Sequence, residues 1–282
     1  MTLPALPAVS PLPLLPTLGQ RTQIMGILNV TPDSFSDGGM FDAASPAFAH
    51  AQAMVAQGAD IIDIGGESTR PGSTPVAETD EIARVVPIIE EMLIEKLPVP
   101  LSIDTYKAGT ARAALAAGAR MVNDVWGLQR EPDIARVAAD FGAPVVIMHN
   151  RAEIDAGIDI VADQIAWFER SLDIAAKAGI PGHHIILDPG IGFGKSLEQN
   201  LEALARLGEL RRFGHPILLG TSRKSFIGRI LNLPVDERLY GTLASNVAGI
   251  LAGADILRVH DVRANFEAAG IADAVKRRGV SA

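Results

Sequence analysis

One short pattern repeats along this chain: an alanine-rich helical stretch ends at a glycine, and a run of β-branched residues follows. It occurs at 57–62, 117–122, 141–146 and 252–257. Glycine readily adopts the left-handed conformation that ends many helices, and a continuous apolar run is typical of a buried parallel strand. The repeat therefore predicts a chain built from strand–helix units.

Apolar runs predict eight such units. Strands are expected at 24–30, 61–65, 101–104, 121–125, 145–149, 185–188, 217–220 and 256–260. Helices are expected at 45–57, 77–96, 106–117, 131–140, 158–178, 197–212, 236–252 and 262–277. Eightfold alternation of strand and helix favours an α/β fold of the closed (β/α)8 TIM barrel type, and an open doubly wound sheet is the alternative.

The length of 282 residues by itself suggests two domains. A single barrel of this type spans about 250 residues, however, so we expect one barrel domain over residues 21–282. Residues 1–20 contain five prolines and no basic leader, which predicts a Pro-rich N-terminal extension that is extended or disordered rather than a signal peptide.

Composition excludes several classes of protein. The net charge of −8 disfavours non-specific binding to nucleic acid or to an anionic membrane. The absence of cysteine excludes disulfides, thiolate metal sites and cysteine nucleophiles. No apolar run is long enough to span a bilayer, and a cytoplasmic location is the expectation.

Each expected strand ends in polar or ionisable groups, with a methionine beside one of them. In a barrel these ends lie on one rim, which is where the active sites of such folds are found. In chain order the rim residues are Asn29; Glu67, Thr69 and Arg70; Asp104; Asn123; Met148 and His149; Asp188; Ser222, Arg223 and Lys224; Arg258 and His260. Any one of them is explained by helix capping, but eight of eight predict a functional pocket.

The rim divides into two chemical sectors. Asp104, Asn123 and Asp188 offer carboxylate and amide groups suited to a flat heterocycle with several N–H donors. The last two strands contribute the cationic side chains Arg223, Lys224, Arg258 and His260, in the part of the barrel that often holds phosphate. The sequence therefore predicts a ligand with a ring at one end and an anion at the other.

Three loops have unusual composition. Residues 31–39 and 66–73 are rich in Gly, Pro, Ser and Asp, and we interpret them as lids that include Asp33 and Arg70, although ordinary surface turns are the alternative. Residues 188–196 contain three alternating glycines but match neither the Walker nor the dinucleotide pattern. They predict a close-packed turn that a ligand can approach.

Six ordered motifs resemble the dihydropteroate synthase family, from about residue 21 to the C-terminus. They are the segments 24–39, 65–72, 102–105, 188–193, 220–224 and 258–261. The resemblance implies a pterin-binding TIM barrel, usually a homodimer, that condenses 6-hydroxymethyl-7,8-dihydropterin pyrophosphate with para-aminobenzoate in folate biosynthesis and is a sulfonamide target. The segment His149-Asn150-Arg151-Ala152 departs from the Met-Gln-Gly-like residues that follow the histidine in many relatives.

The resemblance also implies roles for residues. Pterin binding is expected from Asp104, Asn123, Met148, Asp188, Lys224 and Arg258. Pyrophosphate binding is expected from Asn29, Arg258 and His260, with Asn29 as a ligand of Mg2+. Para-aminobenzoate binding is expected from Thr69, Arg70, Pro71, Phe193 and Ser222, and the catalytic loops are expected to include Asp33, Ser34, Phe35 and Arg70.

Two other functions fit the same barrel. A corrinoid-type pterin-binding methyltransferase needs no pyrophosphate site, so the cations after the last two strands and the first motif count against it. A non-catalytic pterin-binding paralogue would be expected to lose loop residues such as Asn29, Thr69 or Arg70, all of which are present.

Overall fold

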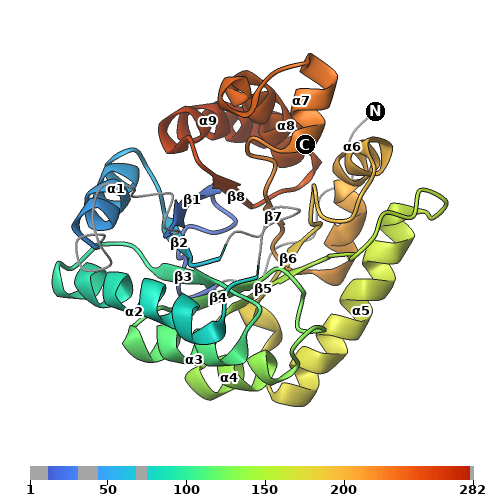
Figure 1. Cartoon of the computed structure of the whole chain (residues 1–282). Helices are drawn as coiled ribbons and strands as arrows, with labels where there is room; N and C mark the ends of the chain where they lie inside the picture. Colours follow the sequence, from blue (N-terminus) through green and yellow to red (C-terminus); the bar gives the residue numbers. More distant parts are fainter. Residues whose placement is uncertain (1–11, 31–43, 68–74, 280–282) are drawn as a thin grey trace.

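Eight parallel strands surrounded by helices form the molecule (Figure 1). The computed structural model describes residues 12–30, 44–67 and 75–279. The strands are β1 Gln23–Asn29, β2 Ile61–Gly65, β3 Leu101–Asp104, β4 Met121–Asp124, β5 Val145–Met148, β6 Ile185–Asp188, β7 Leu218–Leu219 and β8 Ile256–Val259. The α-helices are α1 Ala44–Ala56, α2 Glu78–Ile94, α3 Ala108–Ala117, α4 Asp133–Phe141, α5 Ile160–Ala178, α6 Leu197–Ala205, α7 Ser225–Leu231, α8 Leu239–Ala252 and α9 Val262–Gly279.

The strands follow the order β6-β5-β4-β3-β2-β1-β8-β7, and the ring closes between its two ends. Closure is achieved by one parallel bridge between Leu187 and Ile217, supported by a hydrogen bond of 2.9 Å from the Leu187 amide to the Pro216 carbonyl. The expected (β/α)8 barrel is therefore confirmed, and β7 is shorter than the sequence predicts.

Alternation along each strand divides the core into two clusters. Outward residues such as Ile62, Ile103 and Leu187 pack beneath the helices in a large outer cluster. Inward residues such as Ile61, Met121 and Ile186 form a smaller cluster inside the barrel. Because side chains alternate between the two faces of a strand, residues two positions further along point into the barrel above this inner cluster.

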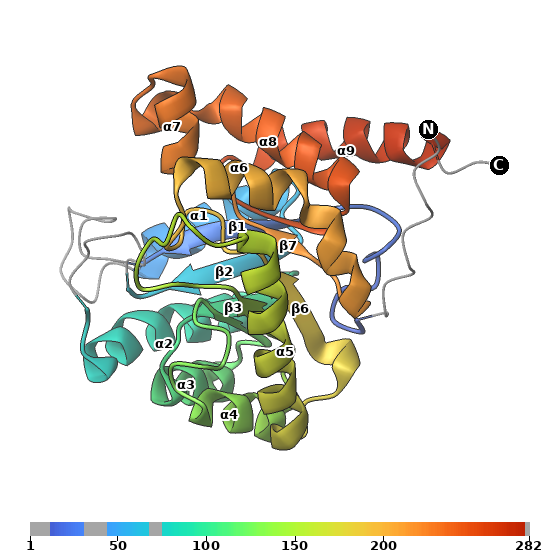
Figure 2. The ribbon, with the colours of Figure 1, turned by 90° about the vertical axis from the view of Figure 1, so that its right-hand side faces the viewer.

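The segment before β1 closes the bottom of the barrel. Residues 12–21 form successive turns, and Leu12, Leu15 and Leu18 are buried in the inner cluster. Figure 2 shows these turns, in blue, at the right-hand end of the barrel. The expectation of an extended or disordered lead-in is therefore wrong for residues 12–20, because three leucines at intervals of three match the spacing of the turns. The domain division at residue 20 stays a prediction.

Helix α7 is an element that the sequence did not predict. It spans only Ser225–Leu231 and ends at Asn232, which has the left-handed φ of 54° that asparagine tolerates. The expected sixth helix over 197–212 is instead α6 followed by a 3-10 helix at Leu207–Phe213. Among the helices in the described part of the chain, none is long and apolar enough to cross a lipid bilayer.

Candidate active site

Five polar residues point into the barrel above its apolar floor. Asp63, Asn123, Asp188 and Arg258 each lie two positions after a member of the inner cluster, and Asp104 likewise follows the buried Ser102. The strand register pairs Asp104 with Asn123, and Met148 pairs with Asp188. The structure therefore brings together the predicted ring-binding residues of β3 to β6 and β8.

The guanidinium of Arg258 links two carboxylates across the barrel. Its Nε donates to Asp63 Oδ2 at 2.6 Å, and its Nη2 donates to Asp104 Oδ2 at 2.6 Å. The second oxygens of Asp63 and Asp104 are buried and have no hydrogen-bond partner among the described residues. Since a buried carboxylate oxygen without a donor is unfavourable, these two atoms are candidate acceptors for N–H groups of a ligand.

Burial changes the acidity of the carboxyl groups. It raises the pKa of Asp104 to about 7, against the opposing attraction of Arg258. Burial also raises the pKa of Asp188, although Asp188 Oδ1 accepts a hydrogen bond of 2.7 Å from the Gly190 amide. Raised carboxyl pKa values in one concave site are typical of a functional centre.

Asp63 is a site residue that the sequence analysis missed. It is fully buried, and besides Arg258 it accepts a hydrogen bond of 3.0 Å from the Asn123 amide nitrogen. This contact uses the Asn123 amide nitrogen as donor, so the side-chain oxygen is the acceptor that Asn123 can offer to a ligand. The alternation of side chains along the strand could have revealed Asp63. An acid flanked by Ile61, Ile62 and Ile64 in a predicted strand has to be paired inside the barrel.

Three predicted cationic side chains after β7 and β8 have different neighbours: Lys224, His260 and Arg223. Lys224 Nζ lies 4.0 Å from the centre of the Phe193 ring, which brings together two predicted substrate contacts. Ser222 Oγ lies 2.9 Å from His260 Nδ1, so the hydroxyl contacts the predicted pyrophosphate ligand. Arg223 is paired with Asp261 at 2.6 Å instead.

A pocket of about 480 Å³ adjoins this region at the rim. Its lining includes Phe193, Lys195, Ser225, Tyr106, Trp126, Arg130 and Arg229. Aromatic and cationic side chains suit an aromatic anion, because ring stacking and charge pairing act together. Ser225, which the sequence analysis did not select, lines this pocket.

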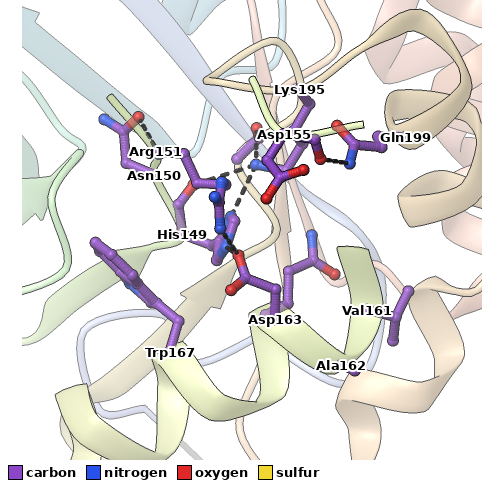
Figure 3. A network of polar contacts seen from close by, with 12 residues as sticks. His149, Asn150, Arg151, Asp155, Val161, Ala162, Asp163, Trp167, Lys195 and Gln199 are labelled. Carbon is purple, nitrogen blue, oxygen red and sulfur yellow. Dashed lines mark hydrogen bonds and ion pairs between the residues drawn. The ribbon is translucent and has the colours of Figure 1, made fainter. Parts of the chain in front are cut away.

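A network of polar contacts adjoins the pocket, whose lining includes Asn150, Arg151 and Lys195 (Figure 3). His149 Nε2 lies 2.9 Å from Asp163 Oδ2, which also accepts from Arg151 Nη1 at 2.8 Å. Hydrogen bonds from His149 and Arg151 lower the pKa of Asp163 to about 2, whereas burial lowers the pKa of His149 to about 4. Arg151, one of the residues after His149 that depart from the family pattern, thus contributes to a charged corner of the site.

Several predicted residues lie outside the described part of the chain. They are Asp33, Ser34, Phe35, Thr69, Arg70 and Pro71. Asn29 is described: it ends β1, and its side-chain oxygen lies near Gly65 on the neighbouring strand. Within residues 12–30, 44–67 and 75–279, no three His, Asp or Glu side chains group into a closed metal site.

Comparisons with known proteins agree with this geometry. Residues 25–260 match the family model of the pterin binding enzymes. The dihydropteroate synthase of Clostridium beijerinckii is 52% identical over 262 residues, which cover 93% of this chain and 97% of that protein.

Two solved structures are also similar. One is the dihydropteroate synthase of Clostridium difficile in the presence of pteroic acid, with a TM-score of 0.89, 52% identity and coverage of 92% of this chain and 98% of that one. The other is the Yersinia pestis enzyme with a sulfonamide drug, with a TM-score of 0.85, 44% identity and coverage of 92% and 95%.

The chain therefore belongs to the family of pterin-binding enzymes. Among them its relatives at this level of identity are transferases, and the chain is a member of the dihydropteroate synthases.

Proposed function

We propose that the protein condenses 6-hydroxymethyl-7,8-dihydropterin pyrophosphate with para-aminobenzoate to give 7,8-dihydropteroate and pyrophosphate in folate biosynthesis. The observation that carries the proposal is the bridge from Arg258 to Asp63 and Asp104. It joins the carboxylates suited to the ring to the cation suited to the leaving anion in one buried cluster.

The ring subsite is proposed to use Asp104, Asn123 and Asp188 as acceptors for the N–H edge of the pterin. Met148 pairs with Asp188 in the strand register and is 3% exposed, and it is proposed to line an apolar side of this space. Arg258 occupies Asp104 Oδ2, which leaves Asp104 Oδ1 to accept from the pterin. We infer that Arg258 packs on the ring and reaches the pyrophosphate with His260.

The chemistry is proposed to be a dissociative, SN1-like displacement. The bond from the pterin methylene carbon to the pyrophosphate oxygen breaks, and its electron pair leaves with the pyrophosphate. The amine nitrogen then forms the new C–N bond and loses a proton. An aromatic amine is neutral near pH 7, so it needs no general base for activation. Asp104 and Asp188 would stabilise the positive charge that develops on the ring.

Magnesium fits the leaving-group side of the site. Mg2+ prefers oxygen ligands and often takes only one or two from the protein, with waters and substrate phosphates completing its shell. Asn29 offers one such oxygen at the rim. When bound, Mg2+ would neutralise charge on the departing pyrophosphate. We expect chelation of Mg2+ to abolish turnover, and its readdition to restore it.

The acceptor subsite is proposed to lie in the pocket beside Phe193 and Lys224. Thr69, Arg70, Pro71 and Ser222 remain predicted contacts of para-aminobenzoate, and Ser225 joins them because it lines the pocket. A sulfonamide would compete here, since it resembles the amine substrate in shape and charge. Asp33, Ser34, Phe35 and Arg70 remain predicted members of the loops that close over both substrates.

A homodimer and a cytoplasmic location complete the proposal. Support for the dimer comes from four exposed apolar side chains on α7, α8 and the turn between them: Ile230, Leu231, Val235 and Tyr240. Exposed apolar clusters of this kind mark association surfaces.

The deciding experiment is pyrophosphate release measured with the pterin pyrophosphate, Mg2+ and para-aminobenzoate. Release that depends on the amine supports the synthase, and Asp104→Ala or Lys224→Ala should cripple it while circular dichroism remains native. A methyltransferase or a non-catalytic pterin binder would release no pyrophosphate on addition of the amine. Near-normal kinetics in both variants would contradict the assigned site.

A further inference from the structure

The loop between β6 and α6 is folded around a buried ammonium group. Lys195 is 5% exposed, and its Nζ lies 2.8 Å from the Gly190 carbonyl, 3.1 Å from the Phe193 carbonyl and 2.8 Å from His149 Nδ1. A fourth acceptor, the His149 carbonyl, lies farther away at 3.5 Å, so the three nearer acceptors match the three hydrogens of the ammonium. The glycine-rich segment 188–196, which matches no nucleotide-binding motif, thus folds around its own Lys195.

The partner of this ammonium is a neutral histidine whose orientation is fixed. The Asp163 carboxylate only accepts hydrogen bonds, so His149 Nε2 carries the hydrogen directed to Asp163, and Nδ1 is left to accept from Lys195. Asp163 is in turn held by Arg151. A continuous chain of polar contacts therefore links α5, the end of β5 and the β6–α6 loop (Figure 3).

Phe193, whose carbonyl accepts a hydrogen bond from Lys195 Nζ, also lines the acceptor pocket. The Phe193 ring lies against Lys224, and Phe193 and Lys195 both line the pocket. The Gly192 amide is tied separately to Asn200 Oδ1 at 2.6 Å. Asp104 and Asn123, in contrast, lie on β3 and β4, away from this loop.

The charges around Lys195 favour and oppose its protonation. Burial lowers its pKa to about 7, Asp188 and Asp163 raise the pKa, and Lys224 and Arg151 lower it further. Neutral His149 contributes an acceptor rather than a charge. When pH rises and Lys195 loses a proton, only two of its three acceptors retain a donor.

We propose that Lys195 is a positioning residue for the acceptor amine, which holds the β6–α6 loop so that Phe193 presents its ring to the incoming aromatic substrate. The inference rests on the proposed function and adds the group that sets affinity for the second substrate. The amine subsite depends on Lys195 through Phe193, whereas Asp104 and Asn123 lie away from this loop and Asp188 contacts it only through the Gly190 amide.

The first test replaces the ammonium in the full-length enzyme with Lys195→Met. Methionine fills a similar volume but leaves both loop carbonyls and His149 without their donor. We expect the KM for para-aminobenzoate to rise about tenfold or more, while kcat and the KM for the pterin pyrophosphate stay within about threefold. Lys177→Met is the matched control, because Lys177 is 75% exposed on α5 and pairs only locally with Asp173.

The second test restores the ammonium chemically. The chain has no cysteine, so Lys195→Cys supplies a single thiol that 2-bromoethylamine converts, in denaturant and before refolding, to a thioether analogue of lysine. We expect recovery of the amine KM. The sulfur lowers the pKa of the new amine, so the alkaline limb of kcat/KM for para-aminobenzoate should move to lower pH than in the wild-type protein. Lys177→Cys taken through the same steps controls for the treatment.

The outcomes are distinct. An unchanged amine KM in Lys195→Met, an equal rise in both KM values, or no recovery after aminoethylation when the Lys177→Cys control recovers would overturn the role of Lys195. If Lys195→Met does not fold, the shift of the alkaline limb in the aminoethylated protein decides alone. A wild-type protein that releases no pyrophosphate in response to the amine would overturn the proposed function, and the role of Lys195 with it.

Discussion

Asp104 keeps its proton up to a pH at which an exposed aspartate is fully ionised. Burial raises its pKa to about 7, and the proposed ring contact needs the carboxylate. Because the ionised form predominates only above the pKa, kcat/KM for the pterin pyrophosphate should fall as pH drops, with a value at pH 6 about tenfold below that at pH 8. A steady-state pH profile checks this, and a flat profile over that range would contradict it.

Individual site residues differ in how far the sequence reveals them. Asp104 and Asp188 end their strands and Asn123 is the penultimate residue of β4, so the barrel rule alone places them on the functional rim. Asp63 lies in mid-strand and is recognised only when the inward face of β2 is known. The contact between Ser222 and His260 joins residues 38 positions apart, and no local pattern specifies such a side-chain orientation.

Among the elements, the turns before β1 should stabilise the fold, because their leucines are buried inside the barrel. Leu15 is 3% exposed inside the barrel. Leu15→Ala should reduce the free energy of unfolding by about 2–5 kcal/mol, because it removes buried apolar area and leaves a cavity. Urea denaturation measures this, with Leu93→Ala, at a position that is 49% exposed on α2, as the control expected to lose much less. Equal losses of unfolding free energy in the two variants would contradict a stabilising role for the turns before β1.

The β6–α6 loop depends on close approach as well as on backbone conformation. Gly190 has a φ of 64°, and a methyl group there would collide with the His149 carbonyl; Gly214 has a φ of 72° and open space around it. Gly214→Ala should therefore cost about 1–2 kcal/mol for the left-handed conformation alone. Gly190→Ala should cost about 1–3 kcal/mol more, because the crowded loop has to move. Thermal or urea unfolding of both variants separates the two effects.

Strand positions were predictable from sequence and two other features were not. Buried parallel strands are continuous apolar runs, and each of the eight predicted strands overlaps the observed one. Helix α7 is too short for a periodic pattern to form, and the proline-rich start of the chain hid the leucine spacing of 12, 15 and 18. In both cases tertiary packing, rather than local propensity, determines the structure.

At the scale of the whole molecule, the apolar surface on α7 and α8 predicts self-association. Sedimentation equilibrium should give twice the chain mass of 29.7 kDa. Tyr240 is 81% exposed in the monomer, so Tyr240→Glu would bury a charge in the interface and should shift the population to monomer. Ile94→Glu changes a side chain that is 75% exposed on α2, outside this surface, and should leave the dimer intact. A wild-type protein that is monomeric at every concentration would contradict the prediction.

The closure of the barrel has a consequence for its motions. The described residues join β6 to β7 by the single bridge of Leu187 and Ile217, whereas β1 and β2 pair along five positions. Local opening of a sheet starts where its ladder is weakest, so backbone amides at this seam should exchange with solvent sooner than those of β1 and β2. The loop that carries Phe193 begins two residues beyond the seam. Local opening of the barrel at this seam should therefore also disturb the loop that carries Phe193 and lines the acceptor pocket.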